Sequence, residues 1–358
     1  MMTILRAAAD DHGRRLDRVL RKALPGVPLS LIHRLLREGK VLVDGRPQGG
    51  NSRLMAGQEI GVPLRAAERD PAGRGLSVPP PGEKRPAPPS ARPPAPSPAR
   101  PPSGALRIIY ENADFLALNK EAGLPVHGAG KSLDALVRAY LAPRLTPSLS
   151  FRPGPLHRLD RPTSGVVVFS VSLRAARYFS ALLREGKIHK QYLALVEGRV
   201  EEPGLWEDRL LRDRETRTTS ASTEGKPART RFSPLTWRPA GTPRKQAGDY
   251  SLLILEPETG RTHQIRAQAA AHGHPLGGDT KYGGRPLPPA LFPAAARGAE
   301  RQGPVFPEPP AFLLHAWKLN PEPASGDNEA VPPLPSLEAP LPDYFSATVK
   351  TLFGKEIL

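Results

Sequence analysis

The chain has 358 residues, no cysteine, and 51 Lys and Arg against 35 Asp and Glu, a formal net charge of +16. Without cysteine it has no disulfide framework and no thiolate metal site. No window approaches the ~20 apolar residues that a membrane helix needs, and the start of the chain lacks a signal-peptide core. The basic excess favours a polyanionic partner, most often nucleic acid. We therefore expect a cytoplasmic protein of two or three domains that binds nucleic acid.

Residues 12–64 predict a small basic module. In "RRLDRVLRKALPG" four apolar residues recur at the spacing of one helical face: Leu16, Val19, Leu20 and Ala23. "SLIHRLLREGK" predicts a second helix, with Ser30 as N-cap and Gly39 as its stop. "VLVDGRP" and "GQEIGVPL" predict strands. Basic residues fill the rest of both helical segments, and we expect them to contact nucleic-acid phosphates: Arg14, Arg15, Arg18, Arg21, Lys22, Arg34 and Arg37.

Residues 65–104 predict a linker. Between Pro71 and Pro102 this segment holds 13 of the 45 prolines of the chain. It offers too few apolar side chains to offset the entropy of ordering, so we expect an extended, polyproline-like spacer.

Residues 105–358 predict one larger domain in which strands outnumber helices. "LRIIYENADFLALNK" predicts two short strands around a turn, and "GVVVFSVS", "KQYLALVEG" and "YSLLILEPETG" predict further strands. "SLRAARYFSALLREGK" predicts a helix with Ser172 near its start, and "RTHQIRAQAAAHG" an Ala-rich helix. Because these elements do not alternate regularly, we expect an α+β domain with a mixed, mainly antiparallel sheet.

One carboxylate, Asp160 in "GPLHRLDRPTSGVVVFS", stands between two arginines and ahead of a Thr-Ser-Gly turn. The chain has no nucleophile elbow, Walker loop or His-Glu-x-x-His helix. His263, His272 and His274 lack an acidic or Cys partner at ligand spacing, so we expect no metal site. An aspartate next to arginines ordinarily forms an ion pair at the protein surface. A loop position at the edge of a core, with cations that keep the carboxylate ionised, instead suits a nucleophile.

"HRLDRPTSG" at 157–165 resembles the His-Arg-Leu-Asp-x-x-Thr-Ser-Gly signature of the pseudouridine synthases of the RluA type. The resemblance continues in "IIYENADFLALNKEAGLPVH", "KIHKQYLALVEG", "GRTHQIRAQAAAHGHPLGGDTKYG", "FLLHAWKL" and "APLPDYF". Residues 12–64 are similar to the small RNA-binding module shared with a small-subunit ribosomal protein. The chain departs from the family at Glu121, where proline is usual, in its long linker, and in a Pro-rich insertion at 284–311.

This resemblance implies roles for four residues. Asp160 corresponds to the catalytic aspartate, and Arg266 to the arginine that pairs with it. Tyr192 corresponds to the tyrosine that lies against the target base and is proposed to move a proton. Arg158 corresponds to the residue that intrudes into the RNA where the uridine leaves. Without the resemblance, Tyr192 fits a strand core or rim residue and Arg266 a helix surface charge.

The expected function is that of an RNA pseudouridine synthase, an isomerase acting on structured RNA, most plausibly large-subunit (23S) rRNA, as a monomer. Isomerisation breaks N1–C1′ and joins C5 to C1′ with no redox change, so we expect no cofactor. Whether the carboxylate attacks C1′, attacks C6 or acts on the 2′-proton stays open. The alternatives are a synthase acting on tRNA and a non-catalytic RNA-binding or ribosome-assembly protein.

Overall fold

The computed structural model describes residues 2–64, 106–128, 130–145, 148–238, 249–288, 291, 311–323 and 332–354. The expected linker and most of the 284–311 insertion lie outside these ranges. The chain divides into two compact units, Met1–Arg100 with Leu141–Pro153, and Pro101–Tyr140 with Gly154–Leu358. Within the described ranges, no helix has both the length and the apolar character needed to cross a membrane.

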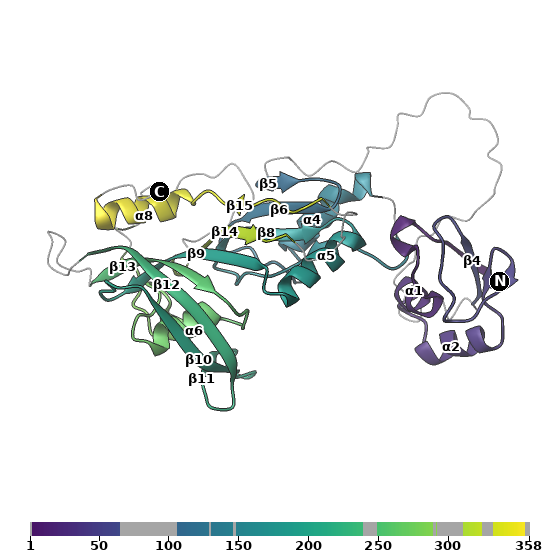
Figure 1. The fold of residues 1–358 in the computed structure, drawn as a ribbon, viewed down its shortest axis with the longest axis horizontal. Coiled ribbons are helices and arrows are strands. Elements are labelled where there is room, and N and C mark those ends of the chain that lie inside the picture. Colours follow the sequence, from purple (N-terminus) through teal and green to yellow (C-terminus); the bar gives the residue numbers. More distant parts are fainter. Residues whose placement is uncertain are drawn as a thin grey trace, which may run out of the picture. The chain divides into compact units, whose positions relative to one another are not determined.

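The first unit packs two helices against a small sheet (Figure 1). The helices are α1 (Leu16–Ala23) and α2 (Leu29–Arg37), preceded by a 3-10 turn, η1 (Ala9–Asp11). The strands, in the sheet order β1-β4-β2-β3, are β1 (Met2–Arg6), β4 (Glu59–Pro63), β2 (Leu42–Val43) and β3 (Arg46–Pro47). Leu16, Val19 and Leu20 are fully buried, which confirms the helical face predicted from their spacing.

Three expectations for this unit need correction. The unit begins before residue 12, because β1 pairs antiparallel with β4 and places Leu5 opposite Ile60. Ser30 does not cap α2. Pro28 is the N-cap residue, and its fixed φ of −54° suits entry into the helix. Arg14 and Arg15 precede α1 and are therefore not helix residues.

A segment that we assigned to the larger domain folds with this unit. We call residues 141–153 the strap. The fully buried carboxylate of Asp11 accepts hydrogen bonds from the Ser148 hydroxyl (3.1 Å), the Leu149 amide (3.0 Å) and the Ser150 hydroxyl. Arg14 donates to the Ser150 carbonyl (3.2 Å) and hydroxyl (2.7 Å). Arg14 therefore holds the strap, and buried polar groups explain the docking. Its expected contact with phosphate stays a prediction.

The second unit is built on an eleven-stranded sheet, in the order β11-β10-β12-β13-β9-β14-β8-β6-β5, with β15 on β14 and β7 on β8. The strands are β5 (Ile108–Glu111), β6 (Phe115–Lys120), β7 (Gly154–Pro155), β8 (Ser164–Ser170), β9 (Ile188–Glu197), β10 (Gly204–Arg212), β11 (Thr219–Ala221), β12 (Lys226–Arg238), β13 (Tyr250–Pro257), β14 (Leu314–Pro321) and β15 (Leu337–Glu338). Among the described pairs, β14–β8 is parallel and the others are antiparallel. This confirms the expected α+β class with a mainly antiparallel sheet.

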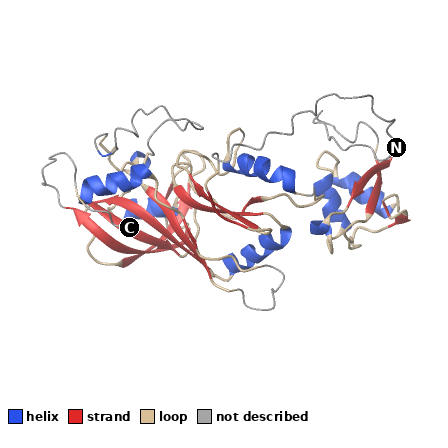
Figure 2. Ribbon diagram, turned by 90° about the horizontal axis from the view of Figure 1, so that it is seen from above, coloured by secondary structure: helices blue, strands red, loops and turns tan. Residues whose placement is uncertain are grey.

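Helices lie on both sides of this sheet (Figure 2). They are α4 (Leu133–Leu141), α5 (Leu173–Arg184), α6 (Gln264–Ala271) and α8 (Asp343–Phe353), with the 3-10 turns η2 (Ala142–Arg144) and η3 (Thr280–Tyr282). Ser172 caps α5 as predicted, by accepting a hydrogen bond from the Ala175 amide. α5 buries Phe179 and Leu182 against β6 and β8, whereas α8 packs on β9 and β13.

The parallel contact between β8 and β14 fixes the chain next to Asp160. Gly165 has φ +112°, and a Cβ there would lie 2.1 Å from the carbonyl oxygen of Ala316, so only glycine permits this approach. His315 is fully buried beside it. Its Nε2–H donates to the Ala339 carbonyl (3.0 Å), and its Nδ1 accepts from the Ser164 hydroxyl (2.9 Å). The Thr-Ser-Gly turn is thereby anchored to the sheet.

Candidate active site

Asp160 lies in the loop between β7 and β8, and backbone contacts brace this loop. The Thr163 amide donates to the carbonyl of Asp160 (3.1 Å). The Gly123 amide donates to the carbonyl of Arg161 (2.8 Å), and the Arg161 side chain donates back to the Gly123 carbonyl (2.9 Å). The loop after β6 therefore holds the loop that carries Asp160.

Lys120 ties the same two loops together from inside the protein. Its side chain is 1% exposed, and its ammonium donates to the carbonyls of Glu121 (2.9 Å), Leu124 (2.9 Å) and Arg161 (3.1 Å). Burial lowers the pKa of Lys120 to about 7, and the carboxylates of Asp160 and Glu121 oppose this shift. In the sequence this lysine lies in the stretch "FLALNKEAG", where no local pattern predicts its role.

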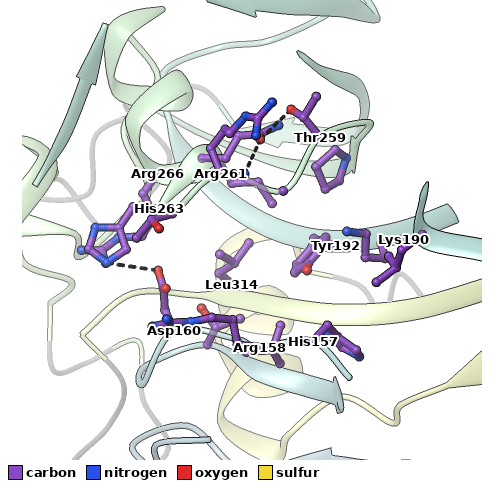
Figure 3. A pocket seen from close by; sticks show the side chains of 18 residues that line it. His157, Arg158, Asp160, Lys190, Tyr192, Thr259, Arg261, His263, Arg266 and Leu314 are labelled. Atoms are coloured by element: carbon purple, nitrogen blue, oxygen red, sulfur yellow. Dashed lines mark hydrogen bonds and ion pairs between the residues drawn. The ribbon is translucent and has the colours of Figure 1, made fainter. Parts of the chain in front are cut away.

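A cavity of about 320 Å³ opens beside Asp160 (Figure 3). Its wall is formed by the Asp160 loop, by β9, and by the turn between β13 and α6. The four residues singled out for the catalytic domain all line it: Arg158, Asp160, Tyr192 and Arg266. These residues come from three separate stretches of the sequence. A cavity of this size suits a small ligand or a single nucleotide.

Arg266 stands between two carboxylates. Its Nε and Nη2 donate to Oδ2 (2.7 Å) and Oδ1 (2.8 Å) of Asp279, a two-bond contact in which both side chains are buried. Its Nη1 lies 3.4 Å from Oδ2 of Asp160. The guanidinium also lies 4.6 Å from the ring centres of Tyr282 and Phe312. The arginine is thus fixed by Asp279 and the two rings while it faces Asp160.

Tyr192 lines the cavity from β9. Burial and the nearby charge of Asp160 raise the pKa of its phenol well above the usual value, so the hydroxyl is neutral at physiological pH. Among the described residues, this hydroxyl has no hydrogen-bond partner. Lys190, two residues earlier on the same face of the strand, also lines the cavity, and burial lowers its pKa.

The three histidines considered as metal ligands have separate partners. His272 Nε2 lies 3.2 Å from a carboxylate oxygen of Asp208, and His274 Nδ1–H donates to the Glu197 carbonyl (3.0 Å). His263 lines the cavity, and its Nε2 lies 3.8 Å from Oδ2 of Asp160. Within the described part of the chain, no group of three or more His, Cys, Asp or Glu side chains is placed to hold a metal ion.

On the first unit, five of the basic residues predicted to contact phosphates are exposed: Arg18, Arg21, Lys22, Arg34 and Arg37. Arg15 is instead paired with Asp17, with Nη2 2.6 Å from Oδ2. The exposed five leave a cationic face on α1 and α2 that suits phosphate contacts.

The cavity combines a carboxylate, a fixed arginine, a neutral tyrosine and an exposed arginine. A carboxylate can act as a nucleophile toward an electron-poor carbon, and this one faces the cavity beside an arginine. Three residues of the site escaped the sequence analysis as site residues: Lys120, His263 and Asp279. Each stands in a quoted motif, but no local pattern shows which distant group it contacts.

The chain is similar to proteins of known name. A family described as RNA pseudouridylate synthase matches residues 114–271, and the S4 domain matches residues 14–60. Ribosomal large subunit pseudouridine synthase C of Salmonella typhi is 32% identical over 361 residues, which cover 98% of this chain and 97% of that protein. The protein of the same name from Escherichia coli K12 is 34% identical over 290 residues, 79% and 80% of the two chains. The structure of human RNA Pseudouridylate Synthase Domain Containing 1 is 25% identical, with a TM-score of 0.46, and the match covers 66% of this chain and 83% of that one.

Proposed function

Because this chain belongs to the RluA-type family of RNA pseudouridine synthases, we propose that it isomerises uridines of large-subunit ribosomal RNA, with Asp160 as the reacting carboxylate. The rRNA target is supported by the names of the relatives that match along most of the chain. Such a substrate is in keeping with the cytoplasmic location expected from the sequence.

The observation that carries the assignment of Asp160 is its contact with Arg266, which is itself locked by Asp279. A buried guanidinium at this distance places a positive charge beside the carboxylate and restrains it at the wall of the cavity. The reaction breaks N1–C1′ and forms C5–C1′ without gain or loss of atoms, so the proposal requires no cofactor. Since Asp160, Tyr192 and Arg266 of one chain line the cavity, we infer that a monomer suffices.

The target nucleotide must leave its helix, because its reacting atoms are inaccessible in a duplex. Arg158 is exposed and lines the cavity, which supports the role that the resemblance implies, occupation of the space that the uridine vacates. Tyr192 is neutral and aromatic, which suits a wall against which the uracil ring lies. Its strongly raised pKa argues against a tyrosinate as the base that removes the C5 proton.

Release of tritium from RNA labelled at uracil C5 tests the function, since pseudouridine formation exchanges this hydrogen with water. The wild-type protein should release tritium from large-subunit rRNA and much less from tRNA. Asp160→Asn should release none and bind the rRNA with similar affinity, because only one negative charge is lost from a cationic site. Equal rates of tritium release from tRNA and from large-subunit rRNA would contradict the proposed preference for rRNA. Binding without any tritium release by the wild type would favour the non-catalytic alternative.

A further inference from the structure

His263 begins α6 in a backbone conformation that bulky residues seldom adopt. Its φ and ψ are 53° and 25°, in the left-handed region. In the described part of the chain, two other non-glycine residues have positive φ, Asp44 and Arg217, and both connect paired strands, where such angles are common. A residue at the start of a helix is ordinarily extended. The strain at His263 is therefore a local feature that its surroundings must hold in place.

Gln264 holds the turn that carries this strain. Its Oε1 accepts hydrogen bonds from the Arg261 amide (3.0 Å) and the Thr259 hydroxyl (2.7 Å). Its Nε2 donates to the Arg229 carbonyl on β12 (2.9 Å). Gln264 thus connects the turn to β12 and also connects two residues within the turn. These hydrogen bonds restrain the backbone from which the His263 side chain projects.

Tyr282 determines which nitrogen of the His263 ring carries the proton. The Thr219 amide donates to the tyrosine oxygen (2.9 Å), and this oxygen lies 2.7 Å from Nδ1 of His263. The two rings meet edge to face, at 87°. Because the tyrosine oxygen already accepts from Thr219, we assign its own proton to the bond with Nδ1. The imidazole proton then sits on Nε2, the nitrogen that faces Asp160.

Two donors consequently approach the same oxygen of Asp160. Arg266 Nη1 lies 3.4 Å and His263 Nε2 3.8 Å from Oδ2. Among the described residues, Oδ1 has no hydrogen-bond or ion-pair partner. We propose that His263 is a positioning residue for Asp160: with Tyr282 fixing its tautomer, it holds Oδ2 together with Arg266 and leaves Oδ1 to meet the target uridine. This inference rests on the proposed function of Asp160.

The charges around His263 make it a neutral donor. Burial lowers its pKa, the carboxylate of Asp160 opposes this shift, and Arg266 on the same helix adds to it. Lys281 of η3 and Arg212 of β10 lower the pKa further. A neutral imidazole restrains Asp160 without adding a second full cation to the one supplied by Arg266, and so preserves the nucleophilic character of the carboxylate.

Two substitutions of His263 separate the two ring nitrogens. Asparagine tolerates positive φ and can place an amide where Nδ1 stands, but it does not reach the position of Nε2. Glutamine can place an amide N–H near that position. In single-turnover assays at saturating enzyme, H263N should be slower by roughly 10- to 100-fold, because a misplacement of the reacting carboxylate by about 1 Å can cost about 100-fold in rate. H263Q should regain a large part of the rate, and both should bind the RNA within about twofold of the wild type.

Three results would overturn the inference: a wild-type rate in H263N, equal losses in H263N and H263Q, or a loss confined to RNA affinity. Should H263N fail to fold, Tyr282→Phe keeps the ring against Arg266 and removes only the hydroxyl. This variant should slow turnover at unchanged affinity, and a wild-type rate would exclude control of the tautomer. Asp160→Asn in the same assay separates the two proposals, because activity there would refute the proposed function whatever His263 does.

Discussion

Arg266 and Asp279 form a buried two-bond ion pair, and this pair places the arginine against Asp160. Asp279 itself lines no part of the cavity wall, so its effect on catalysis passes through Arg266. The motif "GGDTKYG" therefore supplies a structural partner for the motif "RTHQIR".

Asp279→Asn should lower both stability and turnover. The substitution removes the closer of the two carboxylates beside a buried guanidinium, and breaking a buried pair costs about 3–5 kcal/mol in comparable cases. Urea unfolding and single-turnover rates would measure the two effects. The control is Glu201→Gln, which removes an exposed carboxylate paired with Arg199 and should change neither quantity. Full turnover in Asp279→Asn would show that Arg266 needs no such support.

Arg266→Lys should lose turnover even though it keeps the charge. A lysine cannot bind both oxygens of Asp279 and still direct a donor to Asp160, because it lacks the planar fork. A displacement of the catalytic carboxylate by about 1 Å can cost roughly 100-fold in rate, and we expect a loss of this order. Arg231→Lys on β12, at an exposed pair with Glu258, is the matched control. Wild-type rates in Arg266→Lys would mean that positive charge alone suffices.

Neutralising the five exposed basic residues of α1 and α2 should weaken binding to long rRNA. Each phosphate contact that is lost should reduce the slope of log affinity against log salt by up to about 0.9. The saturating rate on a short stem-loop should stay the same, because the chemistry belongs to the second unit. Titrations at several salt concentrations would measure the slope. Substitution is a cleaner test than removal of the first unit, because removal would also take away Asp11 and Arg14, which bind the strap. An unchanged slope would exclude these residues from RNA binding.

Acid should destabilise the protein in part through His315. Burial lowers the pKa of His315 to about 4, whereas an unfolded histidine has a pKa of about 6.5. Between these values the unfolded state binds a proton that the folded state does not, so this contribution to stability is lost as the pH falls. From pH 7 to pH 5 the free energy of unfolding should drop by about 2 kcal/mol on this account.

His315→Gln should be less stable at pH 7 and should show a smaller drop between pH 7 and pH 5, measured by urea unfolding. The same substitution at exposed His33 should leave the drop unchanged. If the free energy of unfolding of His315→Gln fell as much between pH 7 and pH 5 as that of the wild type, His315 would have the same protonation state in the folded and the unfolded protein.

The sequence predicted elements whose apolar residues repeat regularly, such as α1, α5 and the buried strands β8, β9 and β13. It did not predict β10, β11 and β12, because these strands carry many arginines and polar residues that obscure the alternation. Asp160, Tyr192, Arg158 and Arg266 were found through motifs, and the structure places all four at one cavity. The contacts of Lys120, Asp279 and His263 depend on chain crossings that no local pattern encodes.

The strap also sets an order of events during synthesis. β1, α1, α2 and β4 leave the ribosome well before residues 141–153, so the first unit can form its sheet and core while Asp11 still lacks the serines that later satisfy it. The strap, which joins α4 to β7, is then bound by Asp11 and Arg14. The next residues to be synthesised are those of the loop that carries Asp160. The loop that carries Asp160 is thus synthesised after every segment of the first unit.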